Sequence, residues 1–234
     1  TLEAPFLTLE RARQAIRDVK AQNAYPEGGV VVNLRGGDYP RDAAFELTAE
    51  DSGTEGGRVV YRAYPGETVR LLGAEPVSGF GPVTDPAIKA RFPESARDSI
   101  VQADLKAAGV ADYGTLKRRG FGRNVYPAAL EVIFDGAPMT LARWPNEEWA
   151  NIAEVPGGRN GGKFTYAGDR PDRWAPAEDI WLHGYWHWDW ADSYEQIADL
   201  DKAAKTITTV EPHGVYGYKP NARFYFRNVL EELD

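Results

Sequence analysis

The sequence of 234 residues contains no cysteine, one methionine and three histidines. The absence of cysteine excludes disulfide bonds, thiolate nucleophiles and cysteine-based metal sites. No apolar run approaches the roughly 18 residues that a membrane-spanning helix requires, so we expect no membrane span. The formal net charge is −8. Because phosphate backbones attract basic surfaces, this charge argues against a nucleic-acid partner.

Motifs for cofactors and metals are also missing. The glycine-rich stretches lack the Lys-Ser/Thr ending of a phosphate loop, and no serine lies in a nucleophile-elbow motif. His183 and His187 are four residues apart, which on a helix would be a zinc pattern. Their segment is instead typical of a strand, and no third ligand is evident. We therefore expect neither a cofactor nor a metal ion.

Glycine and proline are abundant, with 24 and 16 residues respectively. This composition is typical of many turns between short strands and predicts a mainly β fold. One helix is expected near the N-terminus, where Thr8 can cap its start. Its apolar stripe has helical spacing and comprises Leu9, Ala12, Ile16 and Val19.

Short β-rich runs follow this helix, and turn-forming residues separate them. The runs are Val30–Leu34, Ala44–Leu47, Val59–Ala63 and Val69–Leu72. Runs of this length, spaced by turns of similar size, suggest strands that coil and stack on one another. A β-sandwich is the alternative.

The second half of the chain is typical of an antiparallel β unit. Asp135-Gly136 can supply the positive φ angles of a tight turn between the runs Leu130–Phe134 and Met139–Ala142. Further strands are expected at 164–166, 180–183, 194–198, 206–210 and 223–229.

The densest aromatic segment runs from Trp181 to Asp192. In an extended strand side chains alternate, so Trp186, Trp188 and Trp190 would share one face. The other face would carry His187 and Asp189. A row of indoles can stack on the apolar faces of sugar rings, and imidazole and carboxylate groups can bind hydroxyls. The alternative is that one face is the aromatic core of a β unit, because aromatic residues favour strands on packing grounds alone.

Arg143 and Trp144 are weaker binding candidates that follow the predicted hairpin. Arg143 can pair with a carboxylate or stack on Trp144, and a structural role is the alternative to binding. Glycoside chemistry requires two carboxylates roughly 5 to 10 Å apart. The chain offers many acidic residues and distinguishes no such pair, so no catalytic residue is assigned.

Five segments of the chain carry a resemblance to a known group. They are Pro5–Ala12, Val30–Tyr39, Glu50–Thr54, Val60–Tyr64 and Leu141–Asn146. Together they resemble the start of right-handed parallel β-helix proteins of the pectate-lyase-like superfamily. The resemblance is closest to bacterial glycoside hydrolases of the α-L-fucosidase and xylanase type, which are secreted or periplasmic.

This resemblance implies a mainly β fold that starts a right-handed parallel β-helix, with an N-terminal capping helix and an inserted antiparallel β domain. The expected divisions are 1–78 for the cap and first coils, 79–220 for the insertion, and 221–234 for the return to the β-helix. The chain lacks an initiator methionine and stops directly after an apolar segment. We therefore expect a piece of a longer protein.

The expected function is that of the N-terminal part of a secreted polysaccharide-degrading glycoside hydrolase. Its carboxylate pair would lie on later coils of the same polypeptide, and its partner would be a polysaccharide or oligosaccharide. The alternatives are a polysaccharide lyase and a non-catalytic glycan-binding or structural module. The expected binding residues are Trp186, His187, Trp188, Asp189, Trp190, Arg143 and Trp144.

Overall fold

The computed structural model describes residues 3–127, 129–176 and 179–234. Among them strands outnumber helices, as the turn-rich composition predicts. The chain divides into a first unit, Thr1–Val77, and a second unit, Ser78–Asp234. None of the described helices is long and apolar enough to cross a lipid bilayer.

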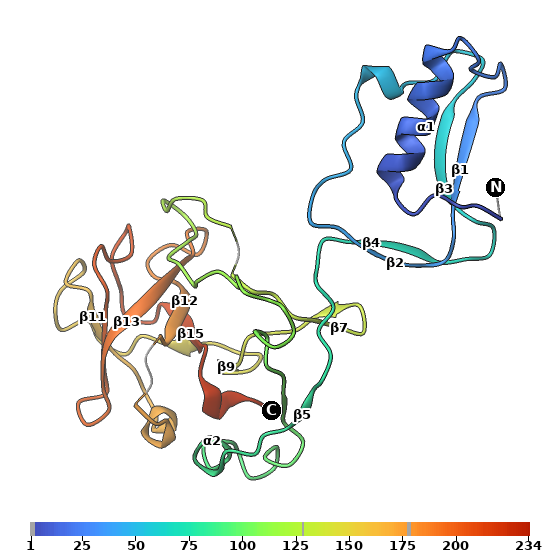
Figure 1. The fold of residues 1–234 in the computed structure, drawn as a ribbon. Helices are drawn as coiled ribbons and strands as arrows, with labels where there is room; N and C mark the ends of the chain where they lie inside the picture. The colour runs from blue at the N-terminus through green and yellow to red at the C-terminus, as the bar shows by residue number, and fades with distance from the viewer. Residues whose placement is uncertain (1–2, 128, 177–178) are drawn as a thin grey trace. The chain divides into compact units, whose positions relative to one another are not determined.

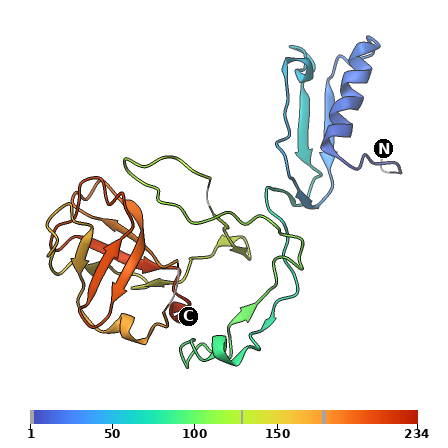
Figure 2. The ribbon, with the colours of Figure 1, turned by 60° about the vertical axis from the view of Figure 1, so that its left-hand side comes forward.

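The helix of the first unit, α1 (Leu9–Ala21), forms where the sequence predicts it. The Thr8 hydroxyl accepts a hydrogen bond from the backbone N–H of Arg11 at 3.1 Å, which satisfies one free donor at the helix start. The helix lies alongside strands β1 (Val30–Leu34) and β3 (Val59–Ala63) (Figures 1 and 2). Its buried residues are Leu9, Ala12 and Ile16.

The strands of the first unit pair in parallel. Strand β1 pairs with β3, and β2 (Gly37–Pro40) pairs with β4 (Val69–Leu72). The chain thus runs through β1 and β2, returns beside β1 as β3, and then lies beside β2 as β4 (Figure 1). Polar side-chain pairs link the part of the chain that contains β1 and β2 to the part that contains β3 and β4. Arg62 Nε donates to Asn33 Oδ1 at 2.9 Å, and the Arg35 guanidinium lies 2.7 Å from the Glu67 carboxylate.

A partly buried ion pair joins α1 to the loop between β2 and β3. Arg17 donates two hydrogen bonds of 2.7 Å to the carboxylate of Asp51, which lies in a 3₁₀ turn (Ala49–Asp51). The Arg17 guanidinium and the backbone N–H of Thr48 hold the pKa of Asp51 well below its ordinary value. The helix is therefore anchored to this loop by a pair that forms with Asp51 ionised.

Two sequence expectations for the first unit are wrong. The expected strand Ala44–Leu47 is irregular, and β2 forms where a turn was expected. No neighbouring strand of the described chain pairs with residues 44–47. Phe45 instead packs edge-on against Tyr61, with ring centroids 5.4 Å apart. Its apolarity reflects this contact rather than a place in a sheet.

The first part of the second unit contains only short elements. They are β5 (Gly81–Pro82), α2 (Pro86–Lys89), β6 (Val101–Gln102), β7 (Ile133–Phe134) and β8 (Ala137–Pro138). Asp135 and Gly136 turn β7 into β8 with φ angles of 48° and 77°. The predicted turn is thus confirmed, although its strands are shorter than expected.

The described part of the second unit contains a seven-stranded antiparallel sheet, ordered β10–β15–β12–β13–β14–β11, with β9 also paired to β15. The strands are β9 (Arg143–Trp144), β10 (Ala150–Asn151), β11 (Lys163–Thr165), β12 (Trp181–Tyr185), β13 (Ser193–Asp201), β14 (Thr206–Thr209) and β15 (Arg223–Arg227). The ends of the sheet join: Ala153 N–H donates to Thr165 O, and Thr165 N–H donates to Glu154 O, both at 2.9 Å. The sheet is therefore closed, and the predicted antiparallel pairing is confirmed.

The segment 221–234 opens with strand β15 of this sheet. After it comes a 3₁₀ turn, Leu230–Glu232, whose Glu232 carboxylate accepts hydrogen bonds from Arg170 and from Trp174 Nε1. The expected return of 221–234 to a β-helix stays a prediction.

The core of the second unit lies on one side of the closed sheet. Side chains alternate along a strand, so Leu182, Phe224 and Phe226 point inward and are fully buried. On the outer side, β12 and β15 carry polar aromatic residues and arginines. The core residues are Ile152, Phe164, Tyr166, Trp174, Ile180, Leu182, Trp186, Ile207, Tyr218, Ala222, Phe224, Phe226 and Val229.

Candidate functional site

The aromatic segment that follows β12 is not an extended strand. Residues 186–192 connect β12 to β13, and the last residues of this hairpin to pair are Gly184 and Ser193. The connection turns where the Ala191 N–H donates to Trp188 O at 3.0 Å. The expectation that Trp186, Trp188 and Trp190 share one strand face is therefore wrong. Alternation requires an extended backbone, and here the backbone reverses.

Trp186 belongs to the core and is only 3% exposed. Its indole N–H donates to Ser193 Oγ at 2.9 Å. Its ring packs against Phe164, Tyr218 and Phe224, with centroid distances of 5.9, 5.3 and 6.1 Å. The alternative considered from the sequence, an aromatic core, thus describes Trp186.

Trp188 and Trp190 are exposed, at 45% and 60%. Trp190 lies edge-on to Phe121 at 5.0 Å and to Tyr216 at 5.6 Å. Phe121 and Tyr216 stack on each other at 5.7 Å. These three rings, Phe121, Trp190 and Tyr216, form a cluster that we call the aromatic triad.

Backbone hydrogen bonds hold Phe121 beside the connection that carries Trp190. The Phe121 N–H donates to Asp192 O at 2.7 Å, and the Tyr194 N–H donates to Arg119 O at 2.8 Å. Between them Gly120 has a φ of 110°, and a Cβ there would lie 2.5 Å from Asp192 O. Only glycine permits this close approach. Sequence reasoning missed Phe121 and Tyr216, because no local pattern links them to the tryptophan segment.

His187 and Asp189 lie beside the exposed indoles in the same connection. The His187 ring meets the Trp188 ring edge-on at 4.7 Å, and Lys219 Nζ lies 5.9 Å from the centre of the Trp188 ring. Asp189 is exposed, with its carboxylate 3.5 Å from Arg223 Nε. The structure thus brings hydrogen-bonding groups near Trp188, although not in the alternating arrangement expected.

Arg143 and Trp144 have mainly structural contacts. The Arg143 guanidinium lies 3.7 Å from the centre of the Tyr225 ring and donates to the carbonyls of Pro145 and Glu148 at 2.7 and 2.8 Å. The expected partners of Arg143, a carboxylate or Trp144, are replaced by Tyr225. Trp144 packs against the core, with its ring centre 6.0 Å from that of Phe226.

His183 lies on the outer side of β12, between two tyrosines. Strand register places it opposite Tyr194 on β13 and opposite Tyr225 on β15. Its Nε2 donates to Asp192 Oδ2 at 2.9 Å, while its buried Nδ1 has no hydrogen-bond partner among the described residues. Burial lowers the pKa of His183, and the Asp192 carboxylate partly opposes this effect.

The pKa of His183 predicts how the second unit responds to acid. The unfolded chain takes up a proton near the ordinary histidine pKa of about 6.5, above the pKa of the folded state. The free energy of unfolding should therefore fall as pH drops below about 6.5. We expect His183→Gln to lose less stability than the native chain between about pH 7 and pH 5, measured by urea unfolding. Equal losses in the two proteins would contradict this role.

No three His, Asp or Glu side chains form a group that could hold a metal ion in the part of the chain that the structure describes. Among the described residues, therefore, no metal site lies at the exposed indoles or at His183.

No protein-family profile matches this sequence, and no curated protein matches it. Among solved structures, one named "Glycoside hydrolase" matches with a TM-score of 0.66 and 16% sequence identity. The match covers 100% of this chain and 38% of that chain. The present chain therefore shares the fold of part of that protein and spans well under half of its length.

Proposed function

We propose that this chain is the N-terminal part of a polysaccharide-degrading enzyme, and that its second unit binds the polysaccharide through the aromatic triad and Trp188. One observation carries the proposal: Trp190 is 60% exposed yet held against Phe121 and Tyr216. An exposed aromatic cluster of this kind is a typical ligand-binding surface. Flat apolar rings suit the C–H faces of sugars, and the match to a glycoside hydrolase supports this ligand class.

The proposal includes a right-handed parallel β-helix that begins in the first unit. Its support is the path of the chain through β1, β2, β3 and β4, which forms two parallel ladders. Parallel connections are almost always right-handed. Within the described residues each ladder has two strands, so β3 and β4 each keep an unpaired edge. Further coils would cover those edges, which are otherwise open to aggregation.

The catalytic groups of the proposed hydrolase would lie on later coils. One carboxylic acid would protonate the glycosidic oxygen, and a second carboxylate would act as base or nucleophile. Release of reducing sugar by the longer protein supports the hydrolase. Unsaturated products that absorb ultraviolet light would indicate a lyase, and glycan retention without turnover would indicate a binding module. Export from a bacterial cell is part of the proposal, and cell fractionation tests it.

The glycan-binding role predicts a loss of affinity in Trp190→Ala. Removing one stacking ring should weaken binding by about 1–2 kcal/mol, close to tenfold in Kd, while stability hardly changes. Affinity electrophoresis of this chain in gels containing xylan or other neutral plant polysaccharides measures the effect. Phe134→Ala is the matched control, because Phe134 is also an exposed ring of the second unit, at 72%, but lies in the β7–β8 hairpin. Equal retardation of Trp190→Ala and the native chain would overturn the proposed binding surface.

A further inference from the structure

A second candidate binding site lies on the outer side of the closed sheet. A cavity of about 740 Å³ has Trp181, Tyr194 and Arg227 on its sheet wall. Residues of the segments 113–127 and 129–142 also line the cavity. This volume lies in the range of small-molecule sites, about 300–1,000 Å³.

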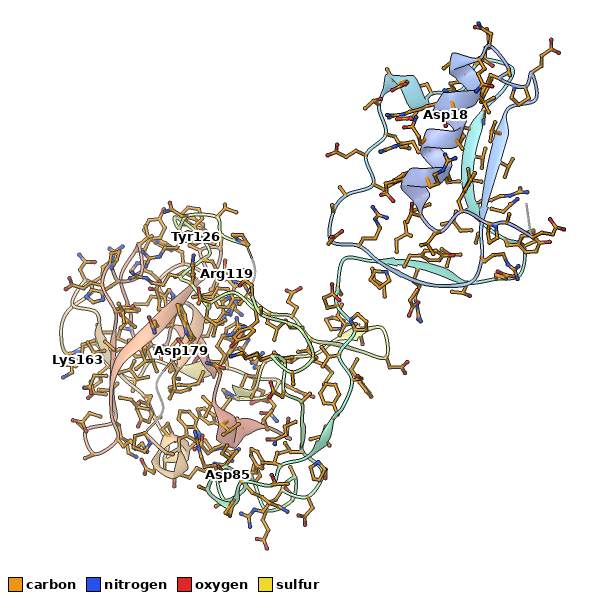
Figure 3. All side chains as sticks on the ribbon, viewed as in Figure 1. Asp18, Asp85, Arg119, Tyr126, Lys163 and Asp179 are labelled. Carbon is orange, nitrogen blue, oxygen red and sulfur yellow. The ribbon has the colours of Figure 1, made fainter. Side chains whose placement is uncertain are left out.

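Three cations line this cavity, and none of them has an ion pair among the described residues. Lys117 Nζ lies 4.8 Å from the centre of the Tyr126 ring. The guanidinium carbons of Arg119 and Arg227 lie 4.5 and 4.8 Å from the centre of the Tyr194 ring. None of the three cations forms a salt bridge with a described carboxylate. Figure 3 labels Arg119 and Tyr126 on the segment that precedes β7. We call Lys117, Arg119 and Arg227 the cavity cations.

Arg227 faces a second arginine that forms no salt bridge with a described carboxylate. Strand register places Arg143 of β9 directly opposite Arg227 of β15. Like charges at directly opposite positions destabilise a sheet. The Nε of Arg227 is also buried without a hydrogen-bond partner among the described residues. An anion bound in the cavity would reduce the repulsion between Arg143 and Arg227 and would offer an acceptor to the Arg227 Nε.

Several other arginines of the same unit hydrogen-bond to a carboxylate or a backbone carbonyl, whereas the cavity cations have no side-chain hydrogen bond to a described residue. Arg118 and Arg159 donate to the carbonyls of Val210 and Tyr216. Arg123 lies 2.8 Å from the carboxylate of Glu195, and Arg170 lies 2.6 Å from that of Glu232. The whole chain carries a net charge of −8. Three cations around one cavity thus have neither a salt bridge nor a side-chain hydrogen bond to a described residue, in a chain with an excess of carboxylates.

Two carboxylates also line the cavity, those of Glu131 and Asp179. Asp179 is labelled in Figure 3. Its Oδ1 accepts hydrogen bonds from Trp181 Nε1 at 2.6 Å and from Gln196 Nε2 at 3.3 Å. The carboxylate is thus oriented by neighbouring donors, and its remaining acceptor capacity suits a hydroxyl group. The lining therefore combines cations, aromatic rings and hydroxyl acceptors.

We propose that this cavity binds an anionic sugar residue, with its carboxylate or sulfate group held by Arg119 and Arg227. Tyr194, against which both guanidiniums pack, supports their position. Asp179 accepts a hydrogen bond from a sugar hydroxyl. This inference rests on the proposed function and narrows it, because it names an acidic polysaccharide as the ligand of a site separate from the aromatic triad.

Calorimetric titration of this chain tests the inference with three probes: a trisaccharide of galacturonic acid, a sulfated galactose trisaccharide and uncharged xylotriose. We expect at least one acidic probe to bind more tightly than xylotriose. Arg119→Met and Arg227→Met should each raise its Kd about tenfold or more. The preferred acidic probe distinguishes a carboxylate ligand from a sulfate ligand. Lys163→Met is the matched control, because it removes one exposed cation of the same unit from β11, outside the cavity lining.

Two further measurements keep the outcomes distinct. Arg227→Lys retains the charge but loses the planar fork, so it should bind more weakly than the native chain and more tightly than Arg227→Met. Thermal unfolding checks that each variant is folded. If Arg227→Met does not fold, Arg119→Met is used to test the inference. Binding of xylotriose that depends on Trp190, with no preference for acidic probes, overturns this inference and leaves the proposed function standing. If no glycan binds, both are overturned.

Discussion

Glu195→Ala is expected to lower the free energy of unfolding of the second unit by about 3–5 kcal/mol, because it leaves a buried arginine without its counter-charge. The Glu195 side chain is fully buried. Its Oε1 accepts hydrogen bonds from Arg123 at 2.8 Å and from Ser193 Oγ at 2.6 Å. Arg123 also donates to the carbonyls of Pro212 and His213 at 3.0 and 2.7 Å. The pair therefore joins β13 to two separate loops.

Urea unfolding followed by tryptophan fluorescence measures this effect. Glu154→Ala removes an exposed carboxylate of the same unit and should change the free energy of unfolding by no more than about 0.5 kcal/mol. The double variant Glu195→Leu with Arg123→Met should recover part of the loss, because neither charge then remains buried alone. A loss below about 1 kcal/mol in Glu195→Ala would show that Arg123 finds water or another partner.

Trp186→Ala is expected to destabilise the second unit by about 3–5 kcal/mol, whereas Trp190→Ala should change stability by no more than about 0.5 kcal/mol. The two indoles are four residues apart in one hairpin connection, but they are 3% and 60% exposed. Trp186 fills space between Phe164 and Phe224, so its removal leaves a cavity. Trp190 contacts other rings only at the surface.

The same urea unfolding, applied to both tryptophan variants, separates these roles. Trp186→Phe keeps most of the apolar volume and should lose less stability than Trp186→Ala. If Trp190→Ala destabilised the second unit as strongly as Trp186→Ala, the aromatic triad would be a structural cluster, and the glycan-binding proposal would lose its main support.

Local patterns predicted most of the regular elements. Thr8 and the apolar spacing after it locate α1, and runs of β-branched residues locate β1, β3 and β4 within their observed bounds. These signals work because capping and alternation depend on neighbours in the chain. They failed at Ala44–Leu47, where an apolar run has no strand beside it.

The tryptophan segment shows what local sequence patterns cannot predict. No sequence pattern within Trp181–Asp192 indicates that the chain reverses after Tyr185. That reversal depends on the pairing of β12 with β13. The same pairing separates Trp186 from Trp190. Phe121 and Tyr216, which complete the aromatic triad, could not be found from the sequence, since they come from distant segments.

The sequence by itself determined the mainly β composition, the capped helix and the positions of most strands, because these follow from intrinsic preferences and turn chemistry. Only the tertiary structure decided which indoles are buried and which arginines pair with a carboxylate. Burial and ion pairing are set by strand register and by loops that return from far along the chain. Arg143 and Arg227 stand opposite each other only because β9 pairs with β15, a pairing for which their separate positions in the chain carry no signal.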